Sequence, residues 1–479
     1  MRAIRAAIPV PGRPTRVSAA RATDAAAERA LAKATRRLIP FLFLLYVVAY
    51  LDRINVGFAA LQMKQDVGLS DRAYGLGAGI FFLGYFLLEV PSNLILERVG
   101  ARLWIARIMV SWGVLSAATM LVRGPASFHV LRFLLGAAEA GFFPGVILYL
   151  TYWFPAAERA RAVARFMTAT AIAGVIGGPV SGALLGLHGS AGLAGWQWLF
   201  LIEGVPAIVL GLVVLGALPD RPADAAWLTP DEQIRLAALV DGEARERAEI
   251  HGESLRAALA SGRLWLLALL YFVLVVGLYG LSLWLPEIVK SLAGWSNLAV
   301  GLATVVPYLV AAVTMVLIGA DSDRRGERRW HVALPAFAGA LGLVLASQAR
   351  APAFALAAFS LAAAGIFGAF GPFWAMPTAF LGGTAAAGGI ALINSIGNLG
   401  GFVGPSLIGL VRDATQSFAG GLLALAASLL AAGLLALSVP EAHLAQRAPA
   451  DRGAGGPGAG GRATRDAGGA SAGARGGAR

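Results

Sequence analysis

Cysteine is absent from the 479-residue sequence, and charged residues are scarce at 14%. Without cysteine the chain has no disulfide, thiolate metal site, iron–sulfur cluster or cysteine nucleophile. The five histidines stand singly, without the paired spacing that ligates zinc, and no Gly-x-x-x-x-Gly-Lys-Ser/Thr loop is present to bind the phosphates of ATP. We therefore expect no cofactor, no metal site, no ATP-driven pump and no enzymatic activity.

Hydrophobic residues make up 58% of the chain, whereas a soluble domain is about half apolar and about a quarter charged. Apolar stretches recur that are long enough to cross a bilayer as helices, and they lack the alternation of barrel strands. The pattern predicts an all-α polytopic membrane protein with twelve transmembrane helices. The predicted spans lie near residues 38–60, 73–96, 102–122, 127–151, 163–187, 197–218, 263–286, 298–320, 330–349, 352–380, 386–411 and 417–439.

The net charge of +12 admits three interpretations: a nucleic-acid partner, anionic lipid, or a signal that orients the chain in the membrane. Position decides between them, because most Lys and Arg residues fall in the two terminal segments and in loops on one side of the predicted spans. The few bases on the opposite side are Lys64, Arg72, Arg123, Lys290, Arg350 and Arg412. This positive-inside pattern predicts a multi-pass protein of the cell inner (plasma) membrane with both termini in the cytoplasm. A nucleic-acid partner is not needed to explain the net charge.

The polar stretches suggest five regions. The basic segment 1–37 lacks the apolar core of a signal peptide, and we interpret it as a disordered cytoplasmic tail or the product of an upstream start codon; a transit peptide is the alternative. Within the linker, Thr229, Pro230 and Glu232 predict a capped helix start. The expected regions are a tail (1–37), an N-terminal six-helix bundle (38–218), a cytoplasmic linker with a short helix (219–262), a C-terminal six-helix bundle (263–439) and a disordered cytoplasmic tail (440–479).

A charged loop occurs twice, at matching places in the two halves. The second copy spans Gly319–Arg329, and the first, Asn93–Arg102, retains an acid, a base and a glycine. Such recurrence is typical of the internal repeats of secondary transporters. We interpret the loops as a conformational latch; the alternative is that their charges only set the topology. The latch residues would be Glu97, Arg98, Gly100, Arg102, Asp323, Arg324, Gly326 and Arg328.

The second copy matches the Gly-x-x-x-Asp-Arg-x-Gly-x-Arg-Arg signature of the major facilitator superfamily at every fixed position, and the chain resembles that superfamily over about residues 37–440. The first copy departs at Asn93 and Leu103 and has Glu97 in place of Asp. The resemblance implies two pseudo-symmetric six-helix bundles around a central cavity, working by alternating access.

Motifs in the first half resemble the anion:cation symporter family, which includes permeases for galactonate, tartrate, glucarate and phthalate. The motifs are Leu51-Asp52-Arg53-Ile54-Asn55, Gly84-Tyr85, Pro91, the run from Arg132 through Glu139 to Gly145, and Gly195–Gly204. This resemblance implies that Asp52 and Glu139 are the proton-coupling pair, that Arg53 contacts the substrate, and that Tyr50 and Tyr85 line the cavity.

Ionisable side chains at membrane depth are costly, so each is a candidate for function. Arg132 and Glu139 are seven residues apart, which places them on one helix face about 10 Å apart along the axis. An arginine can hold a substrate carboxylate through two parallel hydrogen bonds, and competition between that anion and the internal acids would couple proton uptake to binding. The alternative is a structural ion-pair network. The ionisable candidates are Asp52, Arg53, Glu89, Arg132, Glu139 and Glu203.

The second half has no carboxylate in the middle of its predicted spans. Its polar candidates are Asn394 and Asn398, which share a helix face, with Tyr279 and Trp374 as further possibilities; the alternative is polar packing between helices. Two interpretations of Glu89 remain open, an interhelical hydrogen bond and a role in transport. For Glu203 we expect a structural role.

We therefore predict a monomeric secondary active transporter that imports a small organic anion, such as a sugar acid, dicarboxylate or aromatic acid, with protons. An uncoupled facilitator or anion exchanger of the same fold is the alternative. A polytopic receptor or membrane enzyme is more remote, because the longest segment between spans is the 219–262 linker and no nucleophile or metal cluster stands out.

Overall fold

The computed structural model describes residues 16–250, 259–380 and 383–440. Within these ranges every regular element is helical, and twelve helical stretches are long and apolar enough to cross a membrane. The fold is that of two six-helix bundles, as predicted. The expected tail from residue 440 falls almost wholly outside the described residues.

The first bundle consists of the long first helix, three further spans that are each a single helix, and two spans that are each divided into two helices. The fourth span is divided into α4 and α5, and the fifth into α6 and α7. The helices are α1 (Arg16–Asp66), α2 (Asp71–Val99), α3 (Ala101–Ala118), α4 (Pro125–Glu139), α5 (Phe142–Thr151), α6 (Ala156–Met167), α7 (Ala169–Leu185) and α8 (Gly195–Ala217).

The second bundle also has six spans, and its fifth span is divided into α15 and α16. Helix α9 (Pro230–Ile250) lies in the linker between the bundles. The helices of the second bundle are α11 (Gly262–Ala293), α12 (Asn297–Arg325), α13 (Arg329–Ser347), α14 (Pro352–Phe380), α15 (Gly383–Asn398), α16 (Gly400–Thr415) and α17 (Ala419–Ser438).

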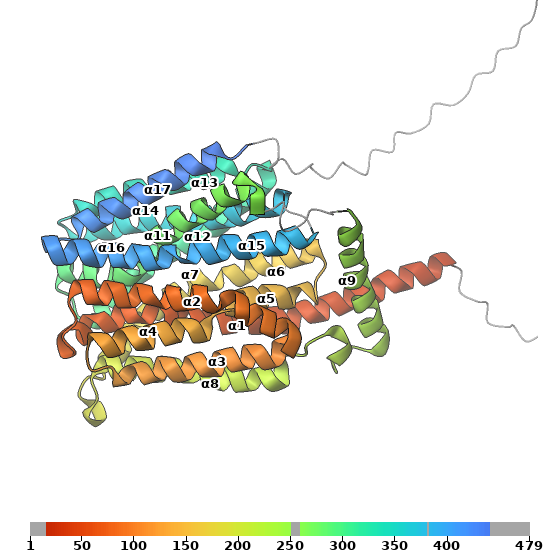
Figure 1. Cartoon of the computed structure of the whole chain (residues 1–479), viewed down its shortest axis with the longest axis horizontal. Helices are drawn as coiled ribbons and strands as arrows, with labels where there is room; N and C mark the ends of the chain where they lie inside the picture. The colour runs from red at the N-terminus through yellow and green to blue at the C-terminus, as the bar shows by residue number, and fades with distance from the viewer. Residues whose placement is uncertain (1–15, 251–258, 381–382, 441–479) are drawn as a thin grey trace, which may run out of the picture. The chain divides into compact units, whose positions relative to one another are not determined.

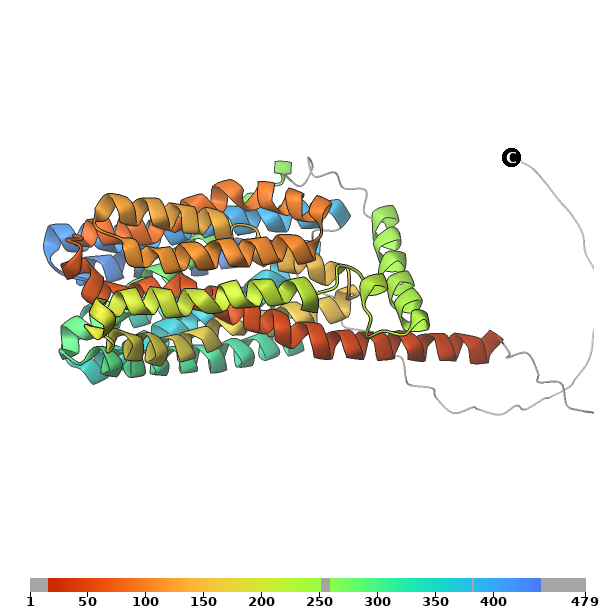
Figure 2. The ribbon, with the colours of Figure 1, turned by 90° about the horizontal axis from the view of Figure 1, so that it is seen from below.

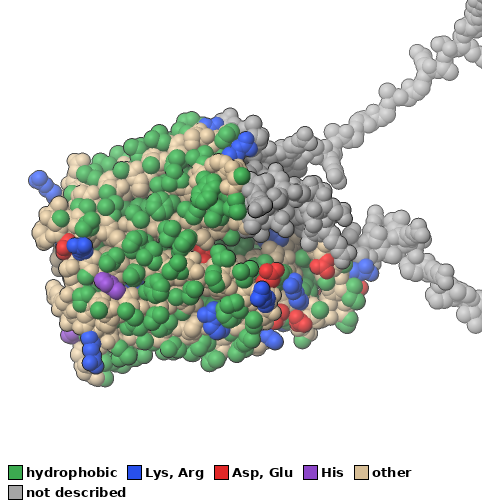
Figure 3. Space-filling model, in the orientation of Figure 1, with side chains coloured by type: hydrophobic (Ala, Val, Ile, Leu, Met, Phe, Trp, Pro, Cys, Tyr) green, Lys and Arg blue, Asp and Glu red, His purple; other side chains and the backbone are tan. Residues whose placement is uncertain are grey.

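The surface matches a protein that faces lipid. Large apolar side chains such as Leu212, Leu317 and Leu434 are more than half exposed, which would be costly in water but not in hydrocarbon. Figure 3 shows hydrophobic side chains over most of the visible flank, with charged side chains gathered mainly toward the ends.

The two bundles meet along α1, α2 and α7 on one side and α11, α12 and α16 on the other, and Figure 2 shows the helices of both bundles running along a common direction. Glycine allows the closest crossing: a Cβ on Gly178 of α7 would lie 2.4 Å from the Gly301 carbonyl oxygen of α12. The bundles therefore touch through backbone at this point, with a cavity between them elsewhere.

The linker helix begins as predicted. The Thr229 hydroxyl accepts from the Glu232 amide at 3.3 Å, and the Glu232 carboxylate accepts from the Thr229 amide at 3.0 Å. This reciprocal pair is a capping box, and it confirms the expected start of α9 at Pro230. In Figure 1, α9 lies at the right, beside the N-terminal part of α1; we call this the linker end of the bundles.

The N-terminal segment differs from the expected disordered tail over residues 16–37, because α1 begins at Arg16 and runs unbroken into the first span. Alanine is frequent there and favours helix, and the segment has a partner: Lys33 donates to Glu232 at 2.7 Å, and Arg29 lies 3.9 Å from the same carboxylate. The linker thus holds the extension. Residues 1–15 lie outside the described residues.

Candidate functional site

A cavity lies between the two bundles, and its lining comes from both. Six of the residues predicted from the sequence line it, together with tyrosine, phenylalanine and methionine side chains. The lining residues are Tyr46, Tyr50, Arg53, Tyr85, Phe143, Met167 and Thr170 from the first bundle, and Tyr271, Leu278, Tyr279, Met315, Phe367, Phe370, Asn394 and Asn398 from the second.

Arg53 is the cation of this lining, and it is 6% exposed. Its Nη2 donates to Glu139 of α4, and its Nη1 donates to the Tyr279 hydroxyl of α11 at 2.8 Å. The guanidinium also lies over the rings of Phe81 and Tyr85, at 5.5 and 5.4 Å from their centroids. One side chain therefore joins an internal acid, an aromatic wall and the opposite bundle.

Asp52 points away from the cavity, into the first bundle. It is 1% exposed, and its carboxylate accepts from Ser116 at 2.8 Å and from the Trp112 indole at 3.0 Å, both in α3. Asn55, one turn further along α1, donates to it at 3.4 Å. The two neighbours Asp52 and Arg53 thus face different partners, as their adjacency on one helix predicts.

Glu139 and Arg132 are both buried on α4, at 1% and 0% exposure, but they have different surroundings. Glu139 is paired with Arg53, whereas none of the guanidinium nitrogens of Arg132 has a hydrogen-bond partner among the described residues. Arg132 instead lies over the Phe81 ring at 4.9 Å. Arg132 does not line the cavity, so the structure does not place this predicted substrate ligand in the cavity wall.

Helix α4 ends directly after Glu139, at a break that the sequence pattern did not predict. Gly141 has φ +87°, and a Cβ there would lie 2.3 Å from the Ser92 hydroxyl oxygen; only glycine meets both demands. The other interrupted spans break after Met167 and after Asn398, both in the cavity lining. Broken helices are common at the binding sites of transporters, and here two of the three breaks directly follow residues that line the cavity.

Glu89 bridges the bundles on the linker side of the cavity. It is 1% exposed, accepts from the Ser395 hydroxyl at 2.8 Å, and also accepts from the amide of Asn394. Asn394 lines the cavity, so Glu89 of α2 holds a cavity residue of α15. This pairing settles the partner of Glu89, which helix periodicity alone left open.

Glu203 contacts Ser181, whose hydroxyl donates to it at 2.8 Å. Both are buried in the first bundle, and this contact between α8 and α7 is a helix-to-helix bond of the kind expected. Trp374 stands behind the cavity wall, edge-on to Tyr271 with ring centroids 4.8 Å apart. Tyr271 lines the cavity and Trp374 does not.

The two charged loops both lie at the linker end and turn at glycine: Gly100 has φ +98° and Gly326 has φ +65°. In the second loop Arg328 donates to Asp323 at 2.6 Å and to Ser322 at 2.9 Å. Glu327 caps the following helix, because its carboxylate accepts from the Trp330 amide at 2.8 Å.

The first loop uses a partner from outside the motif. The Arg102 amide donates to Asp220 at 2.8 Å, and the Arg102 side chain lies 3.7 Å from the same carboxylate. The sequence prediction missed Asp220, which follows α8. The position of Asp220 beside Arg102 of the repeated loop could be recognised only once α3 and α8 were known to be neighbours.

The family model of the Major Facilitator Superfamily matches residues 42–405. The chain belongs to this superfamily. A protein of Agrobacterium vitis named "Putative tartrate transporter" is 53% identical over 402 residues, which cover 84% of this chain and 89% of that protein. A Pseudomonas putida protein named "Putative metabolite transport protein NicT" is 46% identical over 413 residues, covering 85% and 94%.

The fold of this major facilitator protein is also similar to solved structures. A bacterial homolog of the human lysosomal transporter Spinster, in an inward-facing and occupied conformation, aligns with a TM-score of 0.67 over 84% of this chain and 95% of that chain, at 18% identity. Membership in this superfamily makes the chain a membrane-embedded transporter of small organic substrates, not an enzyme.

Proposed function

We propose that this transporter imports a small organic anion together with protons, by alternating access of the cavity between its bundles. The observation that carries the proposal is Arg53: a buried cation in the cavity lining that is held by the internal acid Glu139 and by Tyr279 of the other bundle. A guanidinium in this setting suits a carboxylate, which it can bind through two parallel bonds. A relative named for tartrate supports an organic acid as the cargo.

Coupling follows from the competition for Arg53. While Glu139 is ionised it holds Nη2 of Arg53, and Tyr279 holds Nη1, so a carboxylate that binds through two parallel bonds must compete with at least one of them. Protonation of Glu139 removes its negative charge and frees Arg53 for the substrate, so the proton and the anion favour each other's binding. Asp52, which is held by Trp112 and Ser116, is the second proton carrier in this scheme.

The remaining cavity residues would orient the body of the substrate. The Tyr50 hydroxyl is buried without a partner among the described residues, which suits it to bond a ligand because an unpaired buried hydroxyl is costly. Asn394, Asn398 and Tyr85 offer further polar groups around Arg53. Arg132, outside the lining, would steady the charge of Glu139 rather than touch the substrate.

We further propose that the protein is a monomer in the inner (plasma) membrane with both termini in the cytoplasm, so that the linker end faces inward. The loops of that end and the two terminal segments of the sequence together carry most of the basic residues, in line with the positive-inside rule. The two bundles, 38–218 and 263–439, would then rock about the cavity as units.

Uptake into proteoliposomes tests this function. The purified protein should accumulate at least one acid from a panel of hydroxy acids, dicarboxylates and aromatic acids when the outside is made acidic. Accumulation without dependence on the pH gradient would indicate a facilitator or exchanger instead, and failure of every organic anion to enter or to compete would contradict the proposal.

A further inference from the structure

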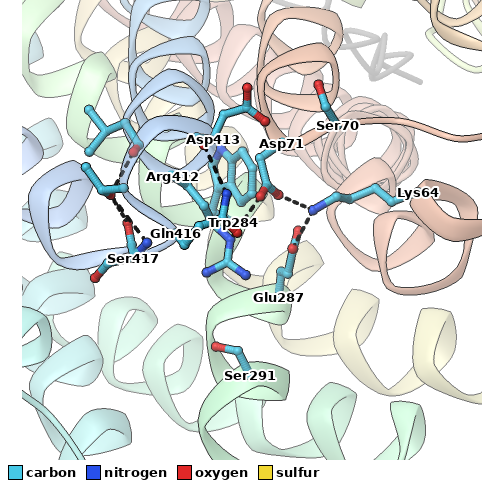
Figure 4. A network of polar contacts seen from close by, with 12 residues as sticks. Lys64, Ser70, Asp71, Trp284, Glu287, Ser291, Arg412, Asp413, Gln416 and Ser417 are labelled. Atoms are coloured by element: carbon cyan, nitrogen blue, oxygen red, sulfur yellow. Dashed lines mark hydrogen bonds and ion pairs between the residues drawn. The ribbon is translucent and has the colours of Figure 1, made fainter.

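Four charged side chains meet between the bundles at the end away from α9. Lys64 stands in the last turn of α1 and Asp71 in the first turn of α2, and both belong to the first bundle. Glu287 of α11 and Arg412, in the last turn of α16, belong to the second. Figure 4 shows the four side chains converging; we call them the outer ion cluster.

The cluster is a chain of alternating charge, and two of its links cross between bundles. Lys64 donates to the carboxylates of Asp71 and of Glu287, the latter at 2.5 Å. The Arg412 Nε lies 3.3 Å from the other Asp71 oxygen. No side chain in the cluster is more than 22% exposed. Lys64–Glu287 and Asp71–Arg412 therefore tie the bundles together where water has little access.

Aromatic side chains stand beside the cluster and add further contacts between bundles. The Tyr74 hydroxyl of α2 donates to the Leu283 carbonyl of α11 at 2.7 Å. Lys64 lies over the rings of Trp284 and Tyr74, at 5.4 and 5.8 Å, and these two rings meet edge to face with centroids 4.8 Å apart. Ions and rings together close this end of the interface.

The arrangement of charges makes this closure reversible. Breaking a buried ion pair is costly when one charge is left alone, but separation of the bundles leaves each with one cation and one anion. Lys64 already contacts Asp71 within the first bundle. Glu287 and Arg412 stand on α11 and α16, which pack on each other. Each pair would then face water together, where ion pairs are worth little.

We propose that the outer ion cluster is the gate of the external face: it is formed while the cavity exchanges with the linker end and it breaks when the cavity opens outward. This inference rests on the alternating access and the orientation in the proposed function. The proposal predicts in which direction the balance between inward-open and outward-open states should shift. Removing a charge from a link between the bundles should favour the outward-open state, because that state alone does not use the link.

The absence of cysteine allows a direct test, since an introduced thiol is the only one in the chain. Thr170 lines the cavity, and Thr170→Cys can be labelled with a membrane-impermeant maleimide. Labelling in right-side-out vesicles reports access from outside, and labelling in inside-out vesicles reports access from the linker end. The variants are Glu287→Gln and Asp71→Asn, which remove charge at nearly constant volume.

Each variant should raise the outside labelling rate and lower the inside rate, so that their ratio changes about tenfold. The matched control is Arg235→Gln, which removes one charge of an exposed pair with Asp231 on α9 and should leave the ratio unchanged. A loss of folding would reduce or scramble both rates together, whereas a gate moves them in opposite directions. Should Glu287→Gln fail to fold, Asp71→Asn decides, because it breaks the link to Arg412.

An unchanged ratio of outside to inside labelling in well-folded Glu287→Gln and Asp71→Asn proteins would contradict the proposal that the outer ion cluster is a gate. Failure of alternating access gives a different result: the thiol in the otherwise unaltered chain would then react equally from both sides, and substrate would not shift its labelling. The two failures are therefore distinguishable in one set of vesicles.

Discussion

Arg53 of the first bundle donates a 2.8 Å hydrogen bond from Nη1 to the hydroxyl of Tyr279 in the second. Its other terminal nitrogen holds Glu139, so a single side chain connects the internal acid to the opposite bundle across the cavity. An anion that binds Arg53 through two parallel bonds must compete with one or both of these contacts. In the proposed mechanism, substrate binding, proton release and the fit between the bundles therefore all depend on one guanidinium.

Arg53→Lys should keep the charge but weaken binding strongly. An ammonium cannot hold Glu139, Tyr279 and a carboxylate in the fork that a guanidinium offers. Hydrogen bonds to charged groups contribute about 1.5–3 kcal/mol, so we expect affinity for the transported acid to fall about 10- to 100-fold in a binding titration of the purified protein. Arg235→Lys on α9 serves as the control. Wild-type affinity in Arg53→Lys would exclude Arg53 as the anion site.

Tyr50→Phe should separate binding from stability. Its hydroxyl lines the cavity without a partner among the described residues, so its loss should not lower thermal stability but should weaken substrate binding about 2- to 10-fold. Tyr149→Phe is the matched control, because the Tyr149 hydroxyl donates to the Pro219 carbonyl at 2.8 Å outside the cavity. That variant should lose about 1 kcal/mol of stability and keep its affinity. The reverse pattern would contradict the assignment.

Asp323→Asn should shift the balance between inward and outward access without unfolding the protein. The Asp323 side chain is 72% exposed, and its bond to Arg328 therefore adds little to stability. If the loop acts as a latch, the outside-to-inside labelling ratio of Thr170→Cys should change about 2- to 5-fold, the size expected for loss of an exposed ion pair. An identical ratio would reduce the repeated loops to topology signals.

The contact between α1 and α9 should depend on pH. The hydrogen bond from Lys33, with that from the Thr229 amide, lowers the pKa of Glu232 below its ordinary value. Because the folded-state pKa is depressed, the contact's stability is present above the ordinary value and is lost as pH falls through the lower one. Hydrogen exchange in α9, corrected for intrinsic rates, should therefore rise in the wild type only as the pH falls below the ordinary pKa of a glutamate carboxyl.

Glu232→Gln should show the same rise already at pH 7, because the amide imitates the protonated acid. Asp231→Asn, which alters the exposed neighbour paired with Arg235, should behave as the wild type. Equal exchange in all three proteins would mean that Glu232 does not hold the N-terminal extension.

Much of the fold could be predicted because local composition identifies membrane spans. The twelve spans, the capping box at Thr229 and Glu232, and the glycine turns at Gly100 and Gly326 each depend on residues close together in the chain. Asp52 and Arg53 point in different directions, and this likewise follows from their adjacency on one helix. The helical extension before residue 38 was missed because its partner, Glu232, lies far along the sequence.

Six residues of the cavity lining are among the sequence candidates, but Arg132 and Trp374 lie outside the lining and the pairings between residues could not be predicted. Helix periodicity placed Arg132 and Glu139 on one face, yet Glu139 pairs with Arg53 of another helix. Glu89 and Asn394 are 305 positions apart, and only the packing of α2 on α15 makes them partners. The break after Glu139 likewise depends on the close approach of Ser92 to Gly141, which composition does not reveal.

Proton movement with substrate tests the central claim most directly. Wild-type protein is reconstituted in liposomes that contain a pH-sensitive dye, with no initial gradient, and a transported organic acid is added outside. We expect the interior to acidify with wild-type protein, and not with Glu139→Gln or Asp52→Asn. Entry of the labelled acid without acidification, or acidification by both variants at the wild-type rate, would contradict proton symport through these two acids.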